Sequence, residues 1–244
     1  MTYPQFKNKH LEEALFNPKD FIKYKNKPGV YPKKYIFIYS TRALNYFRRK
    51  YHPQKIKYSG HTNVFVHKGI GLVWMSGIGG PHAGTVMEEL IALGGKTFLN
   101  IGLAGGLKEV GIFLCRGAFR DEGTSYHYFP HGEIMHPDLA LTNKLGNSIK
   151  KLNLDYKEGL TWTIDAPYRE TKAEIEYYRK NGAFTVEMEA SALFAVAKYR
   201  KVKIASAFVV SDVLAKEWEP KFHVKSIRDK LKLLVDAGVD CLSK

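Results

Sequence analysis

The residues best suited to chemistry in this chain are two carboxylates, Glu187 and Glu189, that flank the thioether of Met188. They stand between a strand-like and a helix-like segment. A further acid, Asp212, follows Ser211 at the end of a β-rich run. An acid at the carboxyl end of a buried strand lies where ligands bind in open α/β sheets. Cleavage of an N-glycosidic bond would use this set, because one carboxylate could hold the hydroxyls of an oxocarbenium-like sugar while another acid assists the leaving base.

Each of these residues also has a purely structural interpretation. Asp212 could cap a helix or lie on the surface. Glu189 could be an acid of a first helical turn, where the helix dipole favours a negative charge. Met188 could simply fill the core. Position alone leaves both interpretations open.

Two glycine-rich segments, 77–84 and 102–106, follow predicted strands and are predicted to be loops. Backbone N–H groups in such loops can approach an anion, and a following helix adds its positive end. Glycine clusters also make tight turns, so each segment has a structural alternative. Neither segment has the spacing of a Walker-A loop or a dinucleotide fingerprint, which excludes kinase and dehydrogenase sites of those kinds.

Strand-like and helix-like segments alternate along the chain. Strands are predicted at 35–39, 96–101, 115–119, 159–164 and 204–210, with a hairpin or meander at 54–58, 62–67 and 70–75. Helices are predicted from the turn at 40–41 through 49, at 85–93, 137–152 and 171–181, with the Glu-Met-Glu segment to about 200, and at 223–242. The last helix is amphipathic, with Leu231, Leu233, Leu234 and Val235 predicted to face inward.

This alternation predicts an α/β fold: a single domain over residues 34–244, with a mixed, mainly parallel sheet flanked by helices. Residues 1–33 are polar and rich in lysine, and we expect them to form an N-terminal arm on the domain or on a neighbouring chain.

The composition is that of a globular protein, with 45% apolar residues in 244. The formal charge is +14, from 38 Lys and Arg against 24 Asp and Glu, but the basic residues form no compact block and no nucleic-acid-binding module is recognisable. No apolar run approaches the ~20 residues that span a bilayer. The two cysteines, Cys115 and Cys241, have no metal-binding spacing. We therefore expect a cytoplasmic protein without metal, membrane or nucleic-acid partners.

Several segments together resemble the nucleoside phosphorylase superfamily, in its purine nucleoside and uridine phosphorylase branch. The resemblance runs from about residue 35 to the C-terminus, and its strongest elements are 186–190 and 211–212. Further matching elements are 77–81 followed by 88–90, then 121–125 and 163–168. The resemblance implies a homo-oligomer, a dimer or a hexamer, that binds a nucleoside and phosphate. It implies no cofactor besides inorganic phosphate as co-substrate.

The resemblance also implies a role for each site residue. Glu189 would bind the ribose 2′ and 3′ hydroxyls, Met188 would pack beneath the sugar, and Glu187 would shape that pocket. Asp212 would protonate the leaving base with support from Ser211. Two further residues, Pro167 and Tyr168, would contact the base. The chain carries no Gln-x-Arg base reader of the kind found in uridine phosphorylases, so a purine is favoured.

The phosphate side departs from the family pattern. Arg42 would have to receive phosphate from a shifted position in the first loop, and the second loop carries Asn100 and Leu103 where an arginine and a hydroxyl are usual. Gly79 and Gly102 belong to the two loops that would border the nucleophile. Each lost charge-assisted bond costs roughly 1.5–3 kcal/mol. Phosphorolysis is the first hypothesis; hydrolysis by the same fold and nucleoside binding without catalysis are the alternatives.

Overall fold

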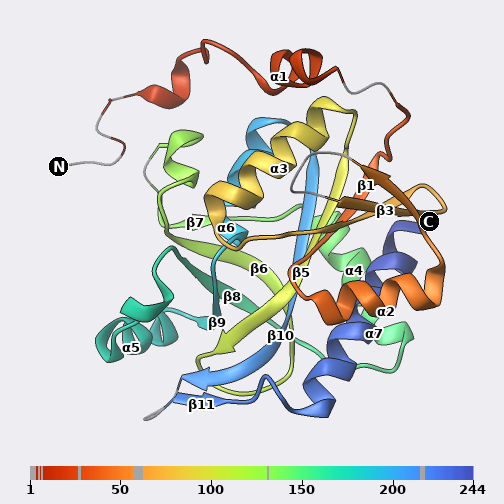
Figure 1. Ribbon diagram of the computed structural model, residues 1–244. Coiled ribbons are helices and arrows are strands. Elements are labelled where there is room, and N and C mark those ends of the chain that lie inside the picture. The colour runs from red at the N-terminus through yellow and green to blue at the C-terminus, as the bar shows by residue number, and fades with distance from the viewer. Residues whose placement is uncertain are drawn as a thin grey trace.

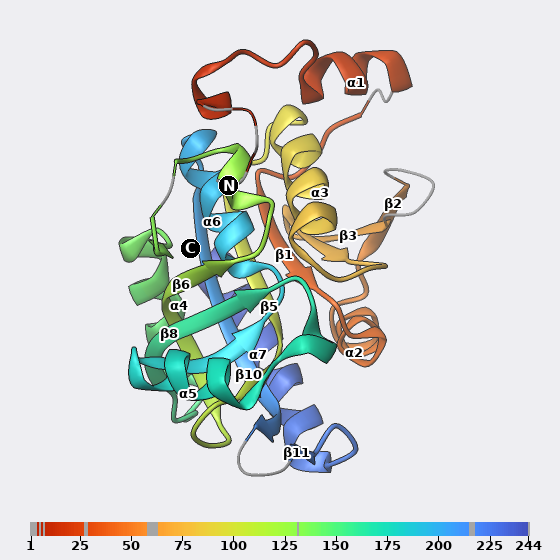
Figure 2. The same cartoon turned by 90° about the vertical axis from the view of Figure 1, so that its left-hand side faces the viewer.

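A computed structural model describes residues 4, 6, 8–26, 29–57, 63–130, 132–214 and 218–243. Figure 1 shows a twisted sheet at the centre with helices on both faces, and Figure 2 shows the same layers from the side. No helix among these residues is both long enough and apolar enough to cross a membrane.

Four parallel strands form the middle of the sheet. In spatial order they are β4 (Ile70–Trp74), β1 (Lys34–Ile38), β5 (Thr97–Gly106) and β10 (Lys203–Leu214). Their side chains are buried on both faces, as expected for strands that helices cover on both sides.

A ring of strands closes beside this parallel core. β10 also pairs with β6 (Ile112–Asp121), which continues to β8 (Lys157–Ile164) and β9 (Ala183–Glu187), and β9 returns to β5. Antiparallel strands extend the sheet at its edges; they are β2 (Gln54–Lys57), β3 (Asn63–His67), β7 (Ile134–Met135) and β11 (Trp218–Pro220). The mixed α/β sheet and the predicted meander at β2–β4 are thereby confirmed.

The helices divide the core into two halves. On one face, α2 (Thr41–Tyr51), α4 (Leu139–Lys151) and α7 (Lys225–Ser243) pack on a cluster that includes Ile36 and Ile38. On the other, α3 (Gly80–Ala92) and α6 (Ala190–Tyr199) pack on a cluster that includes Tyr35 and Phe37. Alternate residues of β1 thus serve opposite faces, as the pleat of a strand requires. α5 (Lys172–Lys180) lies beside β9.

Most predicted elements are present with shifted ends, and three details were wrong. Residues 102–106 are not a loop, because β5 continues through them in pairing with β10 and β9. α3 begins at Gly80 rather than at residue 85. In α7, Leu231, Leu234 and Val235 are buried as predicted, but Leu233 is 37% exposed on the outer side.

The segment before the sheet contains a short 3-10 helix, η1 (Lys9–Leu11), and the helix α1 (Pro18–Lys25). Asn17 caps α1 and forms a capping box with Asp20. In Figure 1 the segment runs across the top of the molecule above α3, and α1 contacts α3. Large apolar side chains nevertheless stay exposed on it, among them Leu15 and Phe16. Whether it is a separate arm ending at residue 33 stays a prediction.

Candidate active site

A pocket of about 470 Å³ opens where β1, β5, β9 and β10 end. It brings together Glu187, Met188 and Glu189 with Ser211 and Asp212. The two acidic segments that the sequence singled out therefore line one cavity. Asp212 lies near the carboxyl end of β10, which runs parallel to β5. β9 runs antiparallel to β5 and brings Glu187 to the same place, because Val186 pairs with Gly105 and Gly105 pairs with Asp212.

Glu187 is held by three hydrogen bonds at the junction between β9 and α6. Its carboxylate accepts one from the Thr163 hydroxyl at 2.6 Å, and two from the backbone N–H groups of Glu189 at 2.8 Å and Ala190 at 2.7 Å. The same Thr163 oxygen accepts the N–H of Ser191 at 3.1 Å. Glu187 thus fixes the turn that carries Glu189.

The Glu189 carboxylate accepts a hydrogen bond from the N–H of Gly79 at 2.6 Å. Gly79 has a φ of 98°, which suits glycine and strains other residues. This N–H is directed at the carboxylate, so the glycine-rich segment before α3 positions the Glu189 side chain. A second lone-pair region of that side chain stays available to a ligand.

The pKa values of the two glutamate carboxyls are shifted from their ordinary value. Burial raises the pKa of both carboxyls, and the charge of Glu189 raises that of Glu187 further. The Tyr39 hydroxyl next to them has a pKa well above its ordinary value, first through burial and then through the charges of the two glutamates. Perturbed acids gathered in one cavity are typical of catalytic sites.

Asp212 lines the same pocket from β10. One of its oxygens accepts the Ser211 hydroxyl at 2.7 Å and the other accepts the indole N–H of Trp218 at 2.8 Å. The register of β10 shifts between Val210 and Asp212, and such a bulge turns a side chain away from the regular alternation of the strand. The predicted Ser-Asp pair is therefore a hydrogen-bonded unit, completed by a tryptophan from β11.

The turn after β8 contributes to the same side, but not as predicted. Pro167 lines the pocket. Tyr168 does not, because its side chain is 99% exposed on the 3-10 turn η3 (Pro167–Arg169) that points it outward. Glu170 enters the pocket from the end of this turn and was missed by the sequence analysis.

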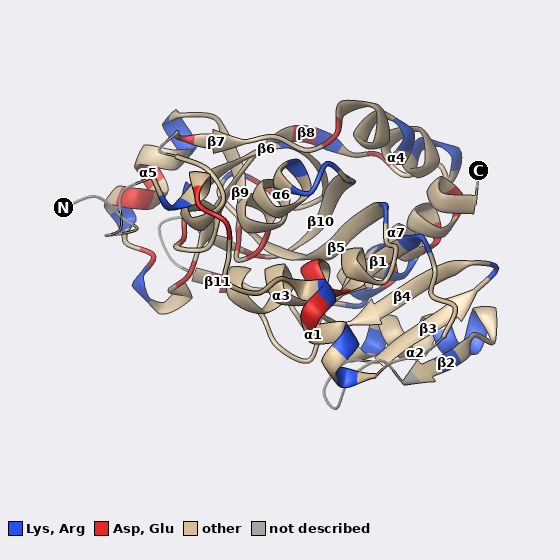
Figure 3. Cartoon of the chain, turned by 90° about the horizontal axis from the view of Figure 1, so that it is seen from above, with Lys and Arg blue, Asp and Glu red and all other residues tan. Residues whose placement is uncertain are grey.

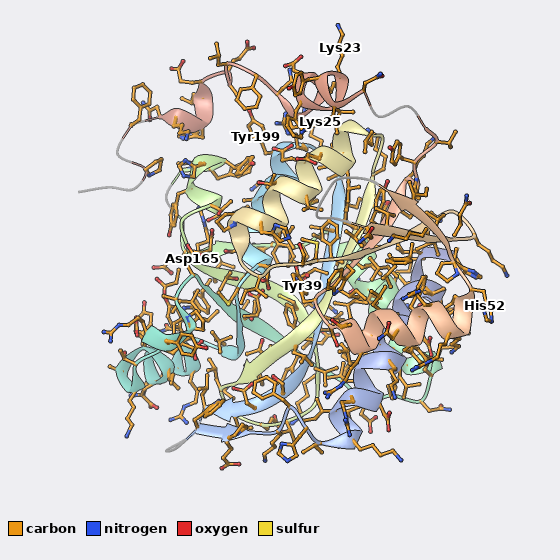
Figure 4. The ribbon with its side chains drawn as sticks, viewed as in Figure 1. Lys23, Lys25, Tyr39, His52, Asp165 and Tyr199 are labelled. Atoms are coloured by element: carbon orange, nitrogen blue, oxygen red, sulfur yellow. The ribbon has the colours of Figure 1, made fainter. Side chains whose placement is uncertain are left out.

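On the third side of the pocket, Tyr39 covers Asn100. The Tyr39 hydroxyl donates to the Asn100 side-chain oxygen at 2.9 Å, and Asn100 is 0% exposed. Figure 4 shows Tyr39 in the interior, where β1 leads into α2. Gly102 lies against the Tyr39 ring, since a Cβ there would be 3.5 Å from it. Asn100 is therefore behind the pocket wall, whereas Gly102 and Leu103 form part of it.

Arg42 lies outside this pocket. Its exposed side chain lines a separate depression between α2 and α7, together with Arg49, Lys225, Arg228 and Lys232. The expected role of Arg42 in receiving phosphate is not met by its position. The described residues that line the pocket of Glu189 and Asp212 include four carboxylic acids and no Lys, Arg or His.

The sequence of residues 38–240 matches the family model described as the phosphorylase superfamily. The chain belongs to the phosphorylase superfamily. The match covers well over half of the chain and includes every residue of the pocket described above. The family resemblance found from the sequence motifs is thereby confirmed.

Proteins similar to this chain in sequence or fold include phosphorylases and a nucleosidase. The chain is 29% identical over 178 residues to a uridine phosphorylase of Treponema pallidum, covering 65% of this chain and 69% of the relative. It is 24% identical over 206 residues to a purine nucleoside phosphorylase of Plasmodium falciparum, covering 81% and 80%. An AMP nucleosidase structure from Bacteroides thetaiotaomicron shares the fold, with a TM-score of 0.76, 21% identity and coverage of 91% and 97%.

Proposed function

We propose that this chain cleaves the N-glycosidic bond of a nucleoside and releases the free base. The observation that carries the proposal is the shared pocket of Glu189 and Asp212, which offers a carboxylate for the sugar on one side and an acid for the base on the other. An oxocarbenium-like transition state needs both.

The ribose would lie on Glu189 and Met188. The carboxylate of Glu189 keeps lone pairs free to accept the 2′ and 3′ hydroxyls, while Glu187 has its oxygens engaged by the protein. Asp212 would act on the leaving base, with Ser211 and Pro167 beside it. No cofactor takes part in this chemistry.

Phosphate is the first candidate for the nucleophile, since the named relatives include several phosphorylases. A phosphate in this pocket would meet carboxylates without a cation from the described lining residues. Each pocket acid that is ionised would oppose phosphate binding by roughly 3 kcal/mol at about 6 Å and an effective dielectric constant of about 20. Phosphorolysis would thus need a cation from a second copy of the chain, which fits the expected homo-oligomer.

Hydrolysis is the second candidate, and the acidic pocket favours it. Water carries no charge and suffers no repulsion from the four acids. Asn100 and Leu103 stand where the family usually has phosphate ligands, and Asn100 is buried under Tyr39.

A purine is proposed as the base, because the chain lacks a Gln-x-Arg pair. The named relatives act on uridine, guanosine and other purine nucleosides, so the choice of base belongs to the test. A role in purine salvage in the cytoplasm is part of the same proposal.

A panel of purine and pyrimidine nucleosides, each incubated with and without phosphate, tests the function. We expect release of free base, with ribose 1-phosphate as the sugar product if phosphate attacks and ribose if water attacks. Asp212→Asn should lower turnover by about 10²-fold or more, as loss of an acid catalyst does. Binding of nucleosides without release of base by the wild-type protein would refute catalysis and support a binding protein.

A further inference from the structure

Glu170 is the one acid of the pocket that receives no hydrogen bond from the described residues. It is half-buried and lines the cavity from the end of the turn that follows β8. The other three pocket acids, Glu187, Glu189 and Asp212, each accept hydrogen bonds from the protein. A carboxyl group that faces a pocket without a protein partner is available to a ligand or a proton.

Asp212, by contrast, has both oxygens engaged. The indole N–H of Trp218 can only donate, and it does so at 2.8 Å to one oxygen, while the Ser211 hydroxyl donates at 2.7 Å to the other. This arrangement suits an ionised carboxylate. Protonation of Asp212 at the Trp218 side would break that bond, so a proton is better held elsewhere in the free protein.

The charges around Glu170 favour its neutral form. Burial raises the pKa of Glu170 to about 7, and the charges of Asp212 on β10 and Glu174 on α5 add to the effect. When the surroundings of neighbouring acids push their pKa values apart, one acid commonly donates the proton of a reaction and the other accepts it. Glu170 is then largely protonated below neutral pH and loses its proton as the pH rises through about 7.

We infer that Glu170 and Asp212 form an acid pair that carries one proton and delivers it to the leaving base. Glu170 would be a second catalytic residue on the base side, and this rests on the proposed function. As the C1′–N bond breaks, its electron pair stays on the base and a base nitrogen takes the proton of the pair. The nucleophile forms the new C1′–O bond, and the pair recovers its proton from solvent.

The inference fits a nucleoside whose base must be protonated to leave. Purine nucleosides belong to this class, and p-nitrophenyl β-D-riboside does not, because p-nitrophenolate leaves as a stable anion. The two substrates share the sugar and the nucleophile. A residue that supplies the proton therefore affects one of them, while a residue that shapes the pocket or binds the sugar affects both.

The test compares wild type, Glu170→Gln and Glu170→Asp on both substrates across pH. For Glu170→Gln we expect kcat/KM for the purine nucleoside near pH 7.5 to fall by about 10²-fold, while the p-nitrophenyl riboside keeps its rate within about twofold. The pH at which nucleoside turnover falls to half should move at least about one unit lower, because the variant lacks the Glu170 carboxyl, whose pKa is raised to about 7. Glu170→Asp should restore part of the high-pH activity.

Glu176→Gln is the matched control, since it makes the same change on α5 in a surface ion-pair cluster with Lys180 and Arg179. It should behave as wild type on both substrates. An equal fall of kcat/KM for both substrates in Glu170→Gln, or an unchanged pH profile for the nucleoside, would overturn the inference while leaving the proposed function intact. A wild-type protein that cleaves neither substrate overturns the proposed function and the acid pair with it.

Discussion

Glu187 and Glu189 differ in how much of each carboxylate the protein already uses. Glu187 accepts three hydrogen bonds that engage both of its oxygens, whereas the N–H of Gly79 donates to one oxygen of Glu189. The sequence predicts both as ribose-side residues, but it gives no means of ranking them. The structure separates a residue that builds the turn from one that can receive a ligand.

Replacement of Glu189 by glutamine should weaken sugar recognition. We expect kcat/KM for a ribonucleoside to fall by about 10- to 100-fold, the loss of one charge-assisted pair of hydrogen bonds worth roughly 1.5–3 kcal/mol. The 2′,3′-dideoxy analogue lacks the hydroxyls that Glu189 would bind, so its slower cleavage should hardly change in the variant. If both substrates lose the same factor in steady-state kinetics, Glu189 does not bind the hydroxyls.

The buried glutamates also predict a pH dependence of stability. Their folded-state pKa values lie above the value of about 4.5 for an exposed glutamate, with Glu187 at about 8. Between these limits the unfolded chain binds fewer protons than the folded chain, so the free energy of unfolding falls as pH rises. The contribution of this pair is fully present below about 4.5 and is lost by about 8.

Calorimetry at several pH values across this range measures the effect. Glu189→Gln removes one of the two titrating groups, so the fall of its Tm with rising pH should be smaller than that of wild type. The control Glu176→Gln, at a surface ion pair away from the pocket, should keep the wild-type slope. A slope in Glu189→Gln equal to that of wild type would show that the pair does not hold its protons in the folded state.

The sequence could identify three of the four pocket acids, but not the direction of every side chain. Tyr168 follows a pocket residue, Pro167, and still points to solvent. Arg42 lies one residue before Ala43, which does line the pocket, yet it projects from the other side of α2. Glu170 belongs to no motif used in the analysis of the sequence. Such differences depend on the rotation of one turn, which a linear pattern does not record.

At the scale of elements, the glycines of β5 explain the least accurate prediction. Residues 102–106 have the composition of a loop, but they pair with β10 and β9. A Cβ at Gly105 would come within 2.9 Å of Val186, and one at Gly106 within 2.8 Å of the Glu109 carbonyl. These glycines permit a close approach of strands, a use that composition cannot distinguish from a turn.

The helices α2 and α7, which both border the pocket, are joined by one buried acid. Asp236 accepts hydrogen bonds from the hydroxyls of Tyr46 at 2.6 Å and Tyr51 at 2.7 Å, and from the Lys50 ammonium at 2.6 Å. Asp236→Ala should lower the free energy of unfolding by about 2–4 kcal/mol, because it leaves the two hydroxyls without their acceptor. Denaturant unfolding measures this loss.

Asp229→Ala is the control on the same helix, since that half-buried acid has a single hydrogen-bonded partner, Lys232, among the described residues and should leave the denaturation midpoint nearly unchanged. A similar shift of the midpoint in both variants would mean that the change from aspartate to alanine alters α7 for a reason common to both positions, such as helix propensity. This hydrogen-bonded cluster around Asp236 could not be predicted from the sequence, because Asp236 and its partners lie far apart along the chain.

At the scale of the whole molecule, positive charge and the pocket are separated. The net charge is +14, yet the ionisable carboxyl groups of the described pocket lining are accompanied by no Lys, Arg or His. Figure 3 shows Lys and Arg spread over several elements, α2, α4 and α7 among them, rather than in one stripe. The fold class and sheet type followed from the alternation of elements. The separation of the positive charge from the pocket could not be predicted in this way, because it depends on which face each helix turns outward.

The predicted homo-oligomer can be tested on the N-terminal segment. Leu11, Leu15 and Phe16 are exposed there, and they lie on or near a large groove of about 820 Å³ beside α3. Light scattering after gel filtration should give a multiple of 27.8 kDa, and Leu15→Asp combined with Phe16→Asp should lower the mass. Thr85→Asp would be a polar-to-charged control on the same groove. A monomeric wild type would contradict the prediction.

Trp218 gives the molecule its own optical probe. The chain has three tryptophans, and Trp162 is fully buried with its N–H bonded to Asp121, whereas the exposed Trp218 ring is tied to Asp212. Any base that settles against Asp212, or any proton that arrives there, changes the surroundings of this indole. Intrinsic fluorescence followed in a stopped-flow instrument should therefore time the arrival of the base separately from the breaking of the glycosidic bond, without a label.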